Sequence, residues 1–155
     1  ALSFRPLPHR MALVAEIGGV RYVDNSKATN VAALLASLRM TTGPVRLIAG
    51  GLAKGEAFEG VANMLCEKVR KVYLIGTAAS DMAAAWSKRV PCELCGTMEA
   101  AVEAARRDAR PGETVLLAPA CASFDQYASY AARGEHFARL VTGAQAKTPA
   151  IDTGE

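Results

Sequence analysis

The sequence has few aromatic residues and no long hydrophobic stretch. Aromatic residues make up 6% of the 155 residues, so aliphatic side chains and alanine must fill the core of the folded domain. No apolar run approaches the roughly 20 residues that a membrane-spanning helix requires. The stretch from Phe4 to Arg10 is too polar and too rich in proline for a signal peptide. We therefore expect a cytoplasmic protein that has no membrane partner.

Histidine and cysteine are also scarce, and their spacing argues against a metal site. The two histidines, His9 and His136, lie near opposite ends of the chain, and the four cysteines include one Cys-x-x-Cys pair, Cys92 and Cys95. A structural zinc site usually needs two such pairs, or one pair together with histidines. A redox pair would lie between a strand and a helix, whereas the residues around Cys92 alternate like a short strand. We predict no metal site, and thiols that stay reduced.

Charge of one sign does not accumulate along the chain. The net charge is +3 and acidic and basic residues are interspersed, which predicts no nucleic-acid partner. With 51% hydrophobic and 21% charged residues, the composition is that of a soluble globular domain. We expect one domain over residues 10–143, a linker with two prolines over residues 1–9, and a flexible tail over residues 144–155. Because the chain begins without methionine, we also expect it to belong to a longer protein.

Strand and helix patterns alternate along most of the chain. Short apolar runs predict strands over residues 45–49, 72–75, 90–94 and 114–118, and the runs 11–17 and 20–23 around Gly18-Gly19 predict a β-hairpin. Apolar residues at helical spacing predict helices near residues 31–38, 61–69, 82–86, 97–105 and 137–141, with one helical turn at 124–128. The expected caps are Thr29 or Asn30 for the first helix, Thr77 or Ser80 for the third, and Thr97 for the fourth.

This alternation is typical of an α/β fold. Apolar strands separated by helices form a mostly parallel sheet that helices cover on both faces, with right-handed crossovers. We therefore predict a Rossmann-like three-layer sandwich that begins with a β-hairpin. In such sheets, ligands bind beyond the carboxyl ends of the strands. The loops after Val23, Ala49, Ile75 and Ala118 should therefore carry the chemistry.

Three of these loops combine small residues with a polar or charged anchor. They are Asp24-Asn-Ser-Lys-Ala-Thr-Asn30, Gly50-Gly-Leu-Ala-Lys-Gly55 and Ala118-Pro-Ala-Cys-Ala-Ser-Phe-Asp-Gln126. The first precedes a helix whose free N–H groups would favour an anion, although a capped and solvated loop would have the same composition. With Lys27 and Lys54, the three loops predict a site for a carboxylate or phosphate compound, without identifying a reaction.

Two catalytic motifs are absent. Lys54 precedes Gly55, and no Gly-x-x-x-x-Gly-Lys-Ser/Thr occurs, so the chain has no P-loop. Ser123, Asp125 and His136 could suggest a hydrolase triad, but Gly-x-Ser-x-Gly does not occur. We therefore interpret Ser123 as a ligand contact and not as a nucleophile.

The same segments resemble the Mur ligase family. Five segments follow the order found in the branch of the family that adds D-glutamate to UDP-N-acetylmuramoyl-L-alanine. They are Leu7-Pro-His-Arg10, Asp24 to Asn30, Gly50-Gly51 with Lys54, Pro119 to Gln126, and Arg133-Gly134-Glu135. The resemblance runs from Leu7 to Val141 and covers only the third domain of the family architecture. It implies that residues 1–9 follow a central ATPase domain outside this chain, which carries the P-loop and is the main holder of ATP and Mg²⁺.

The resemblance also implies a reaction and a set of site residues. The carboxylate of UDP-N-acetylmuramoyl-L-alanine would be activated with ATP as an acyl phosphate, and the amine of D-glutamate would attack it during cytoplasmic peptidoglycan precursor synthesis. The implied D-glutamate contacts are Thr29, Lys54, Ser123, Phe124 and Tyr130, and the implied nucleotide contacts are Arg10, Asp24, Asn25 and Lys27. Lys54 and Lys27 would be catalytic through positioning and electrostatics. The longer enzyme would be a monomer, and this chain alone would be inactive.

The sequence departs from the family pattern at three places. Tyr130 stands where the family usually has phenylalanine, a contact made through the backbone. Asp24-Asn25 reverses the Asn-Asp order of some relatives, so either residue could meet the ribose. Ala53 stands where some relatives have aspartate before the lysine, which removes one magnesium or water contact.

Two other functions are compatible with the same residues. The chain could belong to another amide ligase of the superfamily that adds a different amino acid or extends folate with glutamate, although the string from Ser26 to Asn30 favours D-glutamate. It could also be a non-catalytic anion-binding module that kept the fold.

Overall fold

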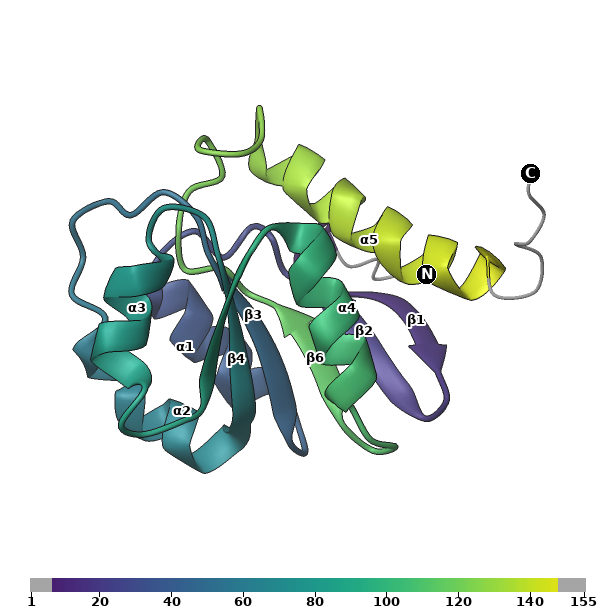
Figure 1. Cartoon of the computed structure of the whole chain (residues 1–155), viewed down its shortest axis with the longest axis horizontal. Coiled ribbons are helices and arrows are strands. Elements are labelled where there is room, and N and C mark those ends of the chain that lie inside the picture. Colours follow the sequence, from purple (N-terminus) through teal and green to yellow (C-terminus); the bar gives the residue numbers. More distant parts are fainter. Residues whose placement is uncertain (1–6, 148–155) are drawn as a thin grey trace, which may run out of the picture.

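The computed structural model describes residues 7–147 as a six-stranded sheet between two layers of helices (Figure 1). The strands are β1 (Ala12–Ile17), β2 (Val20–Asp24), β3 (Val45–Gly50), β4 (Val69–Ile75), β5 (Cys92–Gly96) and β6 (Thr114–Leu117). The helices are α1 (Val31–Met40), α2 (Ala62–Lys68), α3 (Ala79–Trp86), α4 (Met98–Asp108) and α5 (Tyr130–Lys147), and the 3-10 helix η1 (Glu59–Val61) precedes α2. The strand order is β1-β2-β6-β3-β4-β5, and every neighbouring pair is parallel except β1–β2.

Successive side chains of the central strands pack on opposite faces of the sheet. Along β3, Leu47 and Ala49 belong to the core under α1, α2 and α3, whereas Ile48 belongs to the core under α4 and α5. Helix α3 places the fully buried Trp86 in the first core, and α5 places Phe137 in the second. Helices therefore cover both faces of the sheet, which confirms the prediction of a Rossmann-like three-layer sandwich. Coverage of both faces explains why the central strands are mostly apolar.

The predicted N-terminal hairpin is present. Strands β1 and β2 pair antiparallel up to Ile17 and Val20, and the two residues between them, Gly18 and Gly19, have φ angles of 60° and 80°. A two-residue turn of this kind requires positive φ at both positions, which glycine adopts without strain. Among the helices within residues 7–147, none has the length and hydropathy that crossing a membrane demands.

Several expected boundaries and one expected cap were wrong. Helix α3 begins after Ala78 with no side-chain cap, because the Thr77 hydroxyl instead donates to the Gly51 carbonyl at 3.1 Å. Strand β4 begins at Val69, where we expected the end of a helix, and β5 is shifted to Cys92–Gly96. The caps Asn30 and Thr97 are confirmed, since their side chains accept hydrogen bonds from Ala33 and Ala100.

The ends of the described chain also differ from the expected linker and tail. Helix α5 continues to Lys147, so residues 144–147 of the expected tail are helical, and the rest of that tail lies outside the described residues. Residues 7–9 of the expected linker contact the domain, because His9 Nδ1 lies 2.7 Å from Asp24 Oδ2 and the His9 carbonyl accepts from the Lys27 N–H. Residues 1–6 lie outside the described part.

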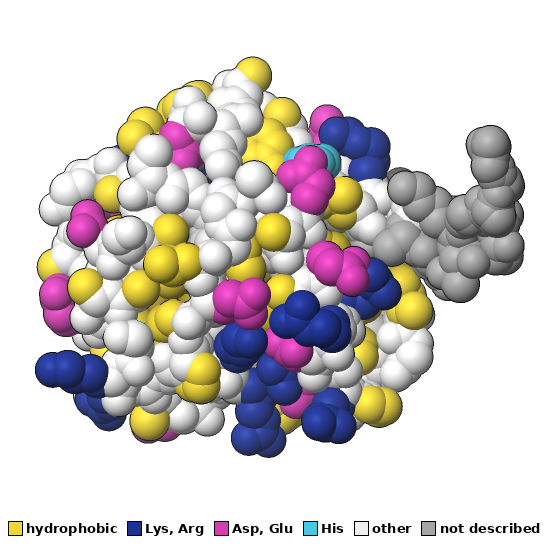
Figure 2. All heavy atoms as spheres, in the orientation of Figure 1, with side chains coloured by type: hydrophobic (Ala, Val, Ile, Leu, Met, Phe, Trp, Pro, Cys, Tyr) yellow, Lys and Arg dark blue, Asp and Glu magenta, His cyan; other side chains and the backbone are white. Residues whose placement is uncertain are grey.

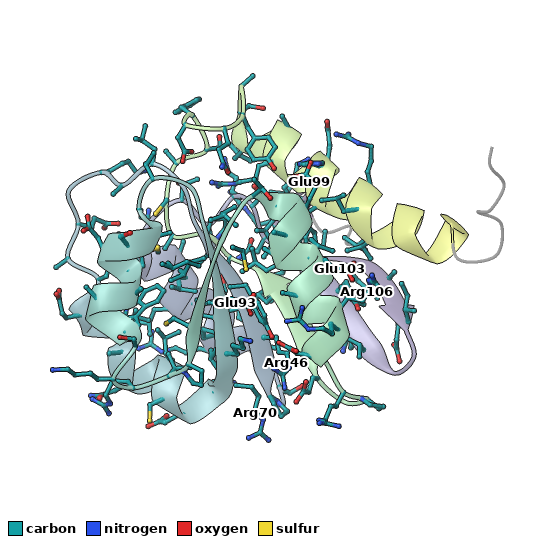
Figure 3. All side chains as sticks on the ribbon, in the orientation of Figure 1. Arg46, Arg70, Glu93, Glu99, Glu103 and Arg106 are labelled. Carbon is teal, nitrogen blue, oxygen red and sulfur yellow. The ribbon has the colours of Figure 1, made fainter. Side chains whose placement is uncertain are left out.

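A partly buried ionic network joins three strands near their amino ends. The Glu113 carboxylate accepts hydrogen bonds from Arg46 Nε at 2.7 Å and from the Arg110 N–H at 2.9 Å, and Arg70 lies 3.8 Å away. Figure 3 shows Arg46 and Arg70 at the edge opposite the loop that follows β6, and Figure 2 shows acidic and basic side chains alternating over this part of the surface. These interactions connect β6 to β3 and β4.

A second part of the network attaches α4 to the sheet. The Tyr73 hydroxyl donates to Asp108 Oδ2 at 2.8 Å and accepts from Arg46 Nη1 at 3.2 Å. Lys71 Nζ lies 3.1 Å from the same Asp108 oxygen and 2.8 Å from Glu93. Burial is the main reason that the pKa of Tyr73 is raised to about 12, so this phenol stays protonated and keeps donating at neutral pH.

Replacing Glu113 by alanine should lower the free energy of unfolding by about 2 kcal/mol, because the half-buried Arg46 guanidinium would lose its carboxylate partner. Urea denaturation of the chain measures this loss. Glu103→Ala is the matched control, since Glu103 pairs with Arg106 on the exposed side of α4 and should cost less than about 0.5 kcal/mol. Equal losses in the two variants would contradict the assigned role of the network.

The network should also make the free energy of unfolding depend on pH. Burial alone would raise the pKa of Glu113, but hydrogen bonds from Arg46 and Arg110 outweigh it and lower that pKa below 4.5. A lowered native pKa means that this stabilisation is complete above the unfolded pKa and is lost as the pH falls through the native value. We expect the unfolding free energy to decrease from pH 5 towards pH 3, and to decrease less in Glu113→Gln. Identical pH profiles would contradict this prediction.

Candidate ligand-binding site at the carboxyl ends of the strands

The three loops that we expected to form a site leave neighbouring strands at the same edge of the sheet. Thr29 follows β2, Lys54 follows β3 and Ser123 follows β6, and β6 lies between β2 and β3 in the sheet. The three strands are parallel, so their carboxyl ends meet at one edge. Figure 1 shows these loops along the upper edge of the sheet, above β3 and β6.

Backbone hydrogen bonds join the three loops directly. The Ala120 N–H donates to the Ala28 carbonyl at 2.8 Å, which connects the loop after β6 to the residue before Thr29. Leu52 and Ala122 exchange two hydrogen bonds, of 2.9 Å and 3.1 Å, which connect the loop of Lys54 to the residue before Ser123. The segments of Thr29, Lys54 and Ser123 are therefore brought together, as the sequence predicted.

Glycine allows the loops to approach this closely. A Cβ atom on Gly51 would overlap with the Ala122 carbonyl oxygen, and one on Gly76 would overlap with the Asp125 carboxylate. The two glycines have φ angles of 136° and 73°, a region that other residues rarely adopt. Ala120 adopts a φ of 63° without being glycine, at a cost of about 1 kcal/mol, where its N–H turns towards Ala28.

The expected D-glutamate contacts differ in exposure. Ser123 is buried, at 2% exposed, and its carbonyl accepts the N–H groups of Gln126 and Tyr127, so it begins the helical turn that we expected near 124–128. Thr29 is half-buried, and the Lys54 side chain is exposed. Phe124 is 67% exposed although it is large and apolar. Hydroxyl groups and an exposed ammonium group on adjoining loops suit recognition of a small carboxylate.

The amino end of α1 already holds a carboxylate from this chain. Asn30 Oδ1 accepts from the Ala33 N–H at 2.8 Å, and Glu56 Oε1 accepts from the Val31 N–H at 3.0 Å. The expectation that this helix start offers its N–H groups to a ligand is therefore corrected, because two of them have partners in the chain. The Glu56 contact also ties the loop of Lys54 to the residues next to Thr29.

Asp24 and Asn25 are engaged inside the domain. Asp24 accepts from the Ser26 N–H at 2.9 Å and contacts His9, while Asn25 accepts from the Met11 N–H at 3.1 Å and donates to Ser37 Oγ at 2.5 Å. Both side chains are buried. Their hydrogen bonds hold the loop and the incoming chain, a role that the sequence did not predict.

A pocket of about 650 Å³ lies between the incoming chain and α1, and it contains three of the four expected nucleotide contacts. Its polar lining includes Arg10, Asn25 and Lys27, whereas Asp24 is not part of it. The apolar lining is formed by Leu7, Met11, Ala28, Ala33, Ala36 and Met40. An apolar concavity with a few polar anchors at its rim is suited to a planar base attached to anionic groups.

Lys27 connects this pocket to the start of α5. Its Nζ donates to the Tyr130 hydroxyl at 3.2 Å and lies 4.4 Å from the centroid of the same ring. The ring is also edge-on to His9, at 6.3 Å between centroids. The hydroxyl that distinguishes Tyr130 from phenylalanine is therefore used, and it contacts a residue of the expected nucleotide group.

Arg133 is a site residue to which the sequence assigned no role. It is 1% exposed and donates to Ser26 and Cys121, in the loops after β2 and β6. The string Arg133-Gly134-Glu135 is part of the family resemblance, but it does not predict that the Arg133 side chain is buried. An arginine in an amphipathic helix is usually expected on the exposed face. Asp125, which the sequence suggested only as a rejected triad member, accepts from the Thr77 N–H at 3.0 Å.

The rejected alternatives find no support in this geometry. Asp125 is paired with Thr77, and His136 contacts the Tyr127 hydroxyl at 2.6 Å and Glu99 at 3.3 Å, so Ser123 has no triad partner in either. Burial is the main cause that raises the pKa of Cys95 and of Cys121 to about 11, which keeps both thiols protonated. Between residues 7 and 147 no group of histidine, cysteine and acidic side chains is arranged to hold a metal ion.

Comparisons with known proteins identify the family of this chain. A family model described as Mur ligase, glutamate ligase domain matches residues 9–121. The chain is 48% identical over 139 residues to the UDP-N-acetylmuramoylalanine–D-glutamate ligase of Desulfatibacillum aliphaticivorans, with 90% of this chain and 31% of that protein covered. It is 50% identical over 147 residues to the enzyme of the same name from Rubrobacter xylanophilus, with 93% of this chain and 33% of that protein covered. The chain thus spans about a third of the length of these relatives.

The fold is likewise similar to solved ligase structures. The MurF ligase of Thermotoga maritima in complex with ADP superposes with a TM-score of 0.61 at 19% identity, covering 94% of this chain and 33% of that one. E. coli FolC in complex with DHPP and ADP superposes with a TM-score of 0.60 at 19% identity, covering 92% of this chain and 32% of that one. Since the family model covers most of the chain, and the expected motifs meet at one edge of the expected fold, the chain belongs to the Mur ligase family.

Proposed function

We propose that this chain is the carboxy-terminal domain of a cytoplasmic, monomeric ligase that adds D-glutamate to UDP-N-acetylmuramoyl-L-alanine with ATP. The observation that carries the proposal is the direct hydrogen bonding between the loops of Thr29, Lys54 and Ser123. Relatives whose names state this activity are about half identical in sequence over nearly the whole chain. The proposal concerns the longer protein, of which this domain would supply the amino-acid site.

In this reaction an amide bond replaces an acyl phosphate. The carboxylate of the UDP-linked L-alanine is activated with ATP, the amine of D-glutamate attacks the activated carbonyl carbon, and phosphate leaves. A covalent nucleophile from the protein is not needed. The domain therefore contributes by holding the amine in line with the carbonyl and by binding charge, two effects that can supply much of a rate enhancement.

The two carboxylates of D-glutamate need a cation and neutral donors. Lys54 is exposed at the rim and can reach the ligand with its ammonium group, while Thr29 and Ser123 offer hydroxyl groups from the two adjoining loops. Charge-assisted hydrogen bonds of this kind are among the stronger contacts in proteins. Phe124 and Tyr130 would limit the site on the side of α5, and the exposed ring of Phe124 is free to pack on the ligand.

The pocket beside α1 would receive the nucleotide when the domains close. Arg10 and Lys27 supply positive charge at its rim, and the apolar residues of α1 supply a surface for the base. Asn25 would contact the nucleotide from within the pocket, whereas Asp24 would act through His9. Magnesium would be held by domains outside this chain.

The amino-acid specificity of the longer enzyme tests the proposal most directly. Purified full-length ligase, supplied with ATP and UDP-N-acetylmuramoyl-L-alanine, should release phosphate with D-glutamate and not with L-glutamate or a diamino acid. Activity with a diamino acid, or with a folate substrate, would instead support another amide ligase of the superfamily. A protein that binds ATP but forms no amide with any of these would support a non-catalytic module.

Lys54→Ala in the full-length enzyme should reduce kcat/KM for D-glutamate at least about 100-fold, because a buried carboxylate would lose its cation. Steady-state kinetics with each substrate varied in turn measures the effect, and the KM for ATP should change little. Lys88→Ala is the matched control, since Lys88 is an exposed lysine that follows α3 and lies outside the three loops. Unchanged use of D-glutamate in Lys54→Ala would reject the role of Lys54.

A further inference from the structure

Arg133 carries a positive charge into the interior of the domain. Its side chain is 1% exposed, and no carboxylate lies within ion-pair distance of it in the part of the chain that the structure describes. Burial is the main cause that lowers the pKa of Arg133 to about 10, so the guanidinium remains charged at neutral pH. Burying a charge without an ion-pair partner is costly, and such a residue persists only where its hydrogen bonds serve a purpose.

The guanidinium hydrogen bonds lead to two of the site loops. Nε donates to Ser26 Oγ at 2.9 Å and Nη2 donates to the Ser26 carbonyl at 2.8 Å, in the loop after β2. Nη1 donates to the Cys121 carbonyl at 3.0 Å, in the loop after β6. All three nitrogens are thus used, and the planar fork fixes the direction of each bond.

The third loop packs against the same group. A Cβ atom on Gly51, in the loop after β3, would lie 3.2 Å from Arg133 Nη1, so this loop passes close beside the guanidinium. Ser26 extends the contact to α5, since its hydroxyl accepts from Arg133 and donates to the Tyr130 carbonyl at 2.7 Å. One side chain therefore touches every segment that contributes a proposed D-glutamate contact.

We propose that Arg133 is a positioning residue for the amino-acid site, whose guanidinium fork sets the relative placement of the loops that bear Thr29, Lys54 and Ser123. The inference rests on the function proposed above, and it adds a residue that touches no substrate. Ser26 and Cys121 are its direct partners, three residues before Thr29 and two residues before Ser123. A shift of either partner would move the hydroxyl groups that hold the substrate carboxylates, and small displacements of bound reactants reduce rates strongly.

The positioning of the loops depends on the three directed hydrogen bonds of the guanidinium group more than on its positive charge alone. Lysine at position 133 would keep the positive charge but could not donate in three fixed directions, whereas glutamine would keep some donors and lose the charge. Comparing Arg133→Lys with Arg133→Gln therefore separates the two contributions. If the fork positions the loops, both variants impair the site.

The test uses the full-length ligase with steady-state kinetics for each substrate. In Arg133→Lys and in Arg133→Gln, the KM for D-glutamate should rise at least about tenfold, while the KM for UDP-N-acetylmuramoyl-L-alanine stays within about twofold of the wild type. The control is Phe137→Leu, one turn further along α5, where a fully buried ring of the core under α4 and α5 is trimmed. It should lower the melting temperature and leave the KM for D-glutamate unchanged.

The outcomes separate this inference from the proposed function. A wild-type enzyme that attaches no D-glutamate would refute the proposed function, whereas normal D-glutamate kinetics in Arg133→Lys would refute only the positioning role. A rise in KM that Phe137→Leu reproduces at a matched melting temperature would also refute it. If the Arg133 variants do not fold, Ser26→Ala removes one acceptor of the fork and should raise the KM for D-glutamate about threefold; an unchanged KM there would overturn the proposal.

Discussion

The close approach of the loops after β2, β3 and β6 is the constraint on which the rest of the site depends. A parallel sheet brings strand ends to one edge, but it does not by itself bring loops into contact. Here the contact is made by backbone hydrogen bonds from Ala120 to Ala28 and between Leu52 and Ala122, and by the buried guanidinium of Arg133. These interactions are short and directional, so the loops have little freedom to move independently.

The two ends of the sheet use polar groups differently. At the amino ends, Glu113 pairs with Arg46, and the Tyr73 hydroxyl links Arg46 to Asp108, which pairs with Lys71. These contacts satisfy the charges within the domain and favour stability. At the carboxyl ends, small residues leave space, and the cations Lys54 and Lys27 have no carboxylate within ion-pair distance in the described residues. A surface with unpaired positive charges of this kind is suited to an anionic partner.

In the proposed ligase, this domain would position and bind the amino acid rather than activate a phosphate. The sequence has no P-loop, and our proposal assigns the ATP chemistry to other domains of the longer ligase. The pocket beside α1 and the edge with Lys54 are linked through the contact between Lys27 and Tyr130. In the proposed ligase, the nucleotide and the amino acid would therefore bind at neighbouring parts of one edge, as expected for a domain that closes over a reaction centre.

Local patterns in the sequence determined the type of fold and the region of the site. Two glycines between short apolar runs were sufficient for the hairpin, and side-chain oxygens at Asn30 and Thr97 were sufficient for two helix starts, because these preferences act within a few residues. The alternation of apolar strands and helices placed Thr29, Lys54 and Ser123 at one edge, because parallel strands all end on the same side. Strand limits and the cap of α3 were less predictable, since Thr77 bonds to Gly51 across the sheet instead of to its own helix.

Only the tertiary structure decided how the side chains of the site are used. Asn25 is hydrogen-bonded to Met11 and Ser37, and Glu56 accepts from the first N–H group of α1. Arg133 donates to Ser26, which lies 107 positions earlier in the chain. Contacts over such separations leave no periodicity in the sequence, because they depend on how strands and helices pack and not on neighbouring residues. The sequence by itself therefore determined which loops meet, whereas the packing of α5 and the loop geometry decided which of their side chains are bonded to one another.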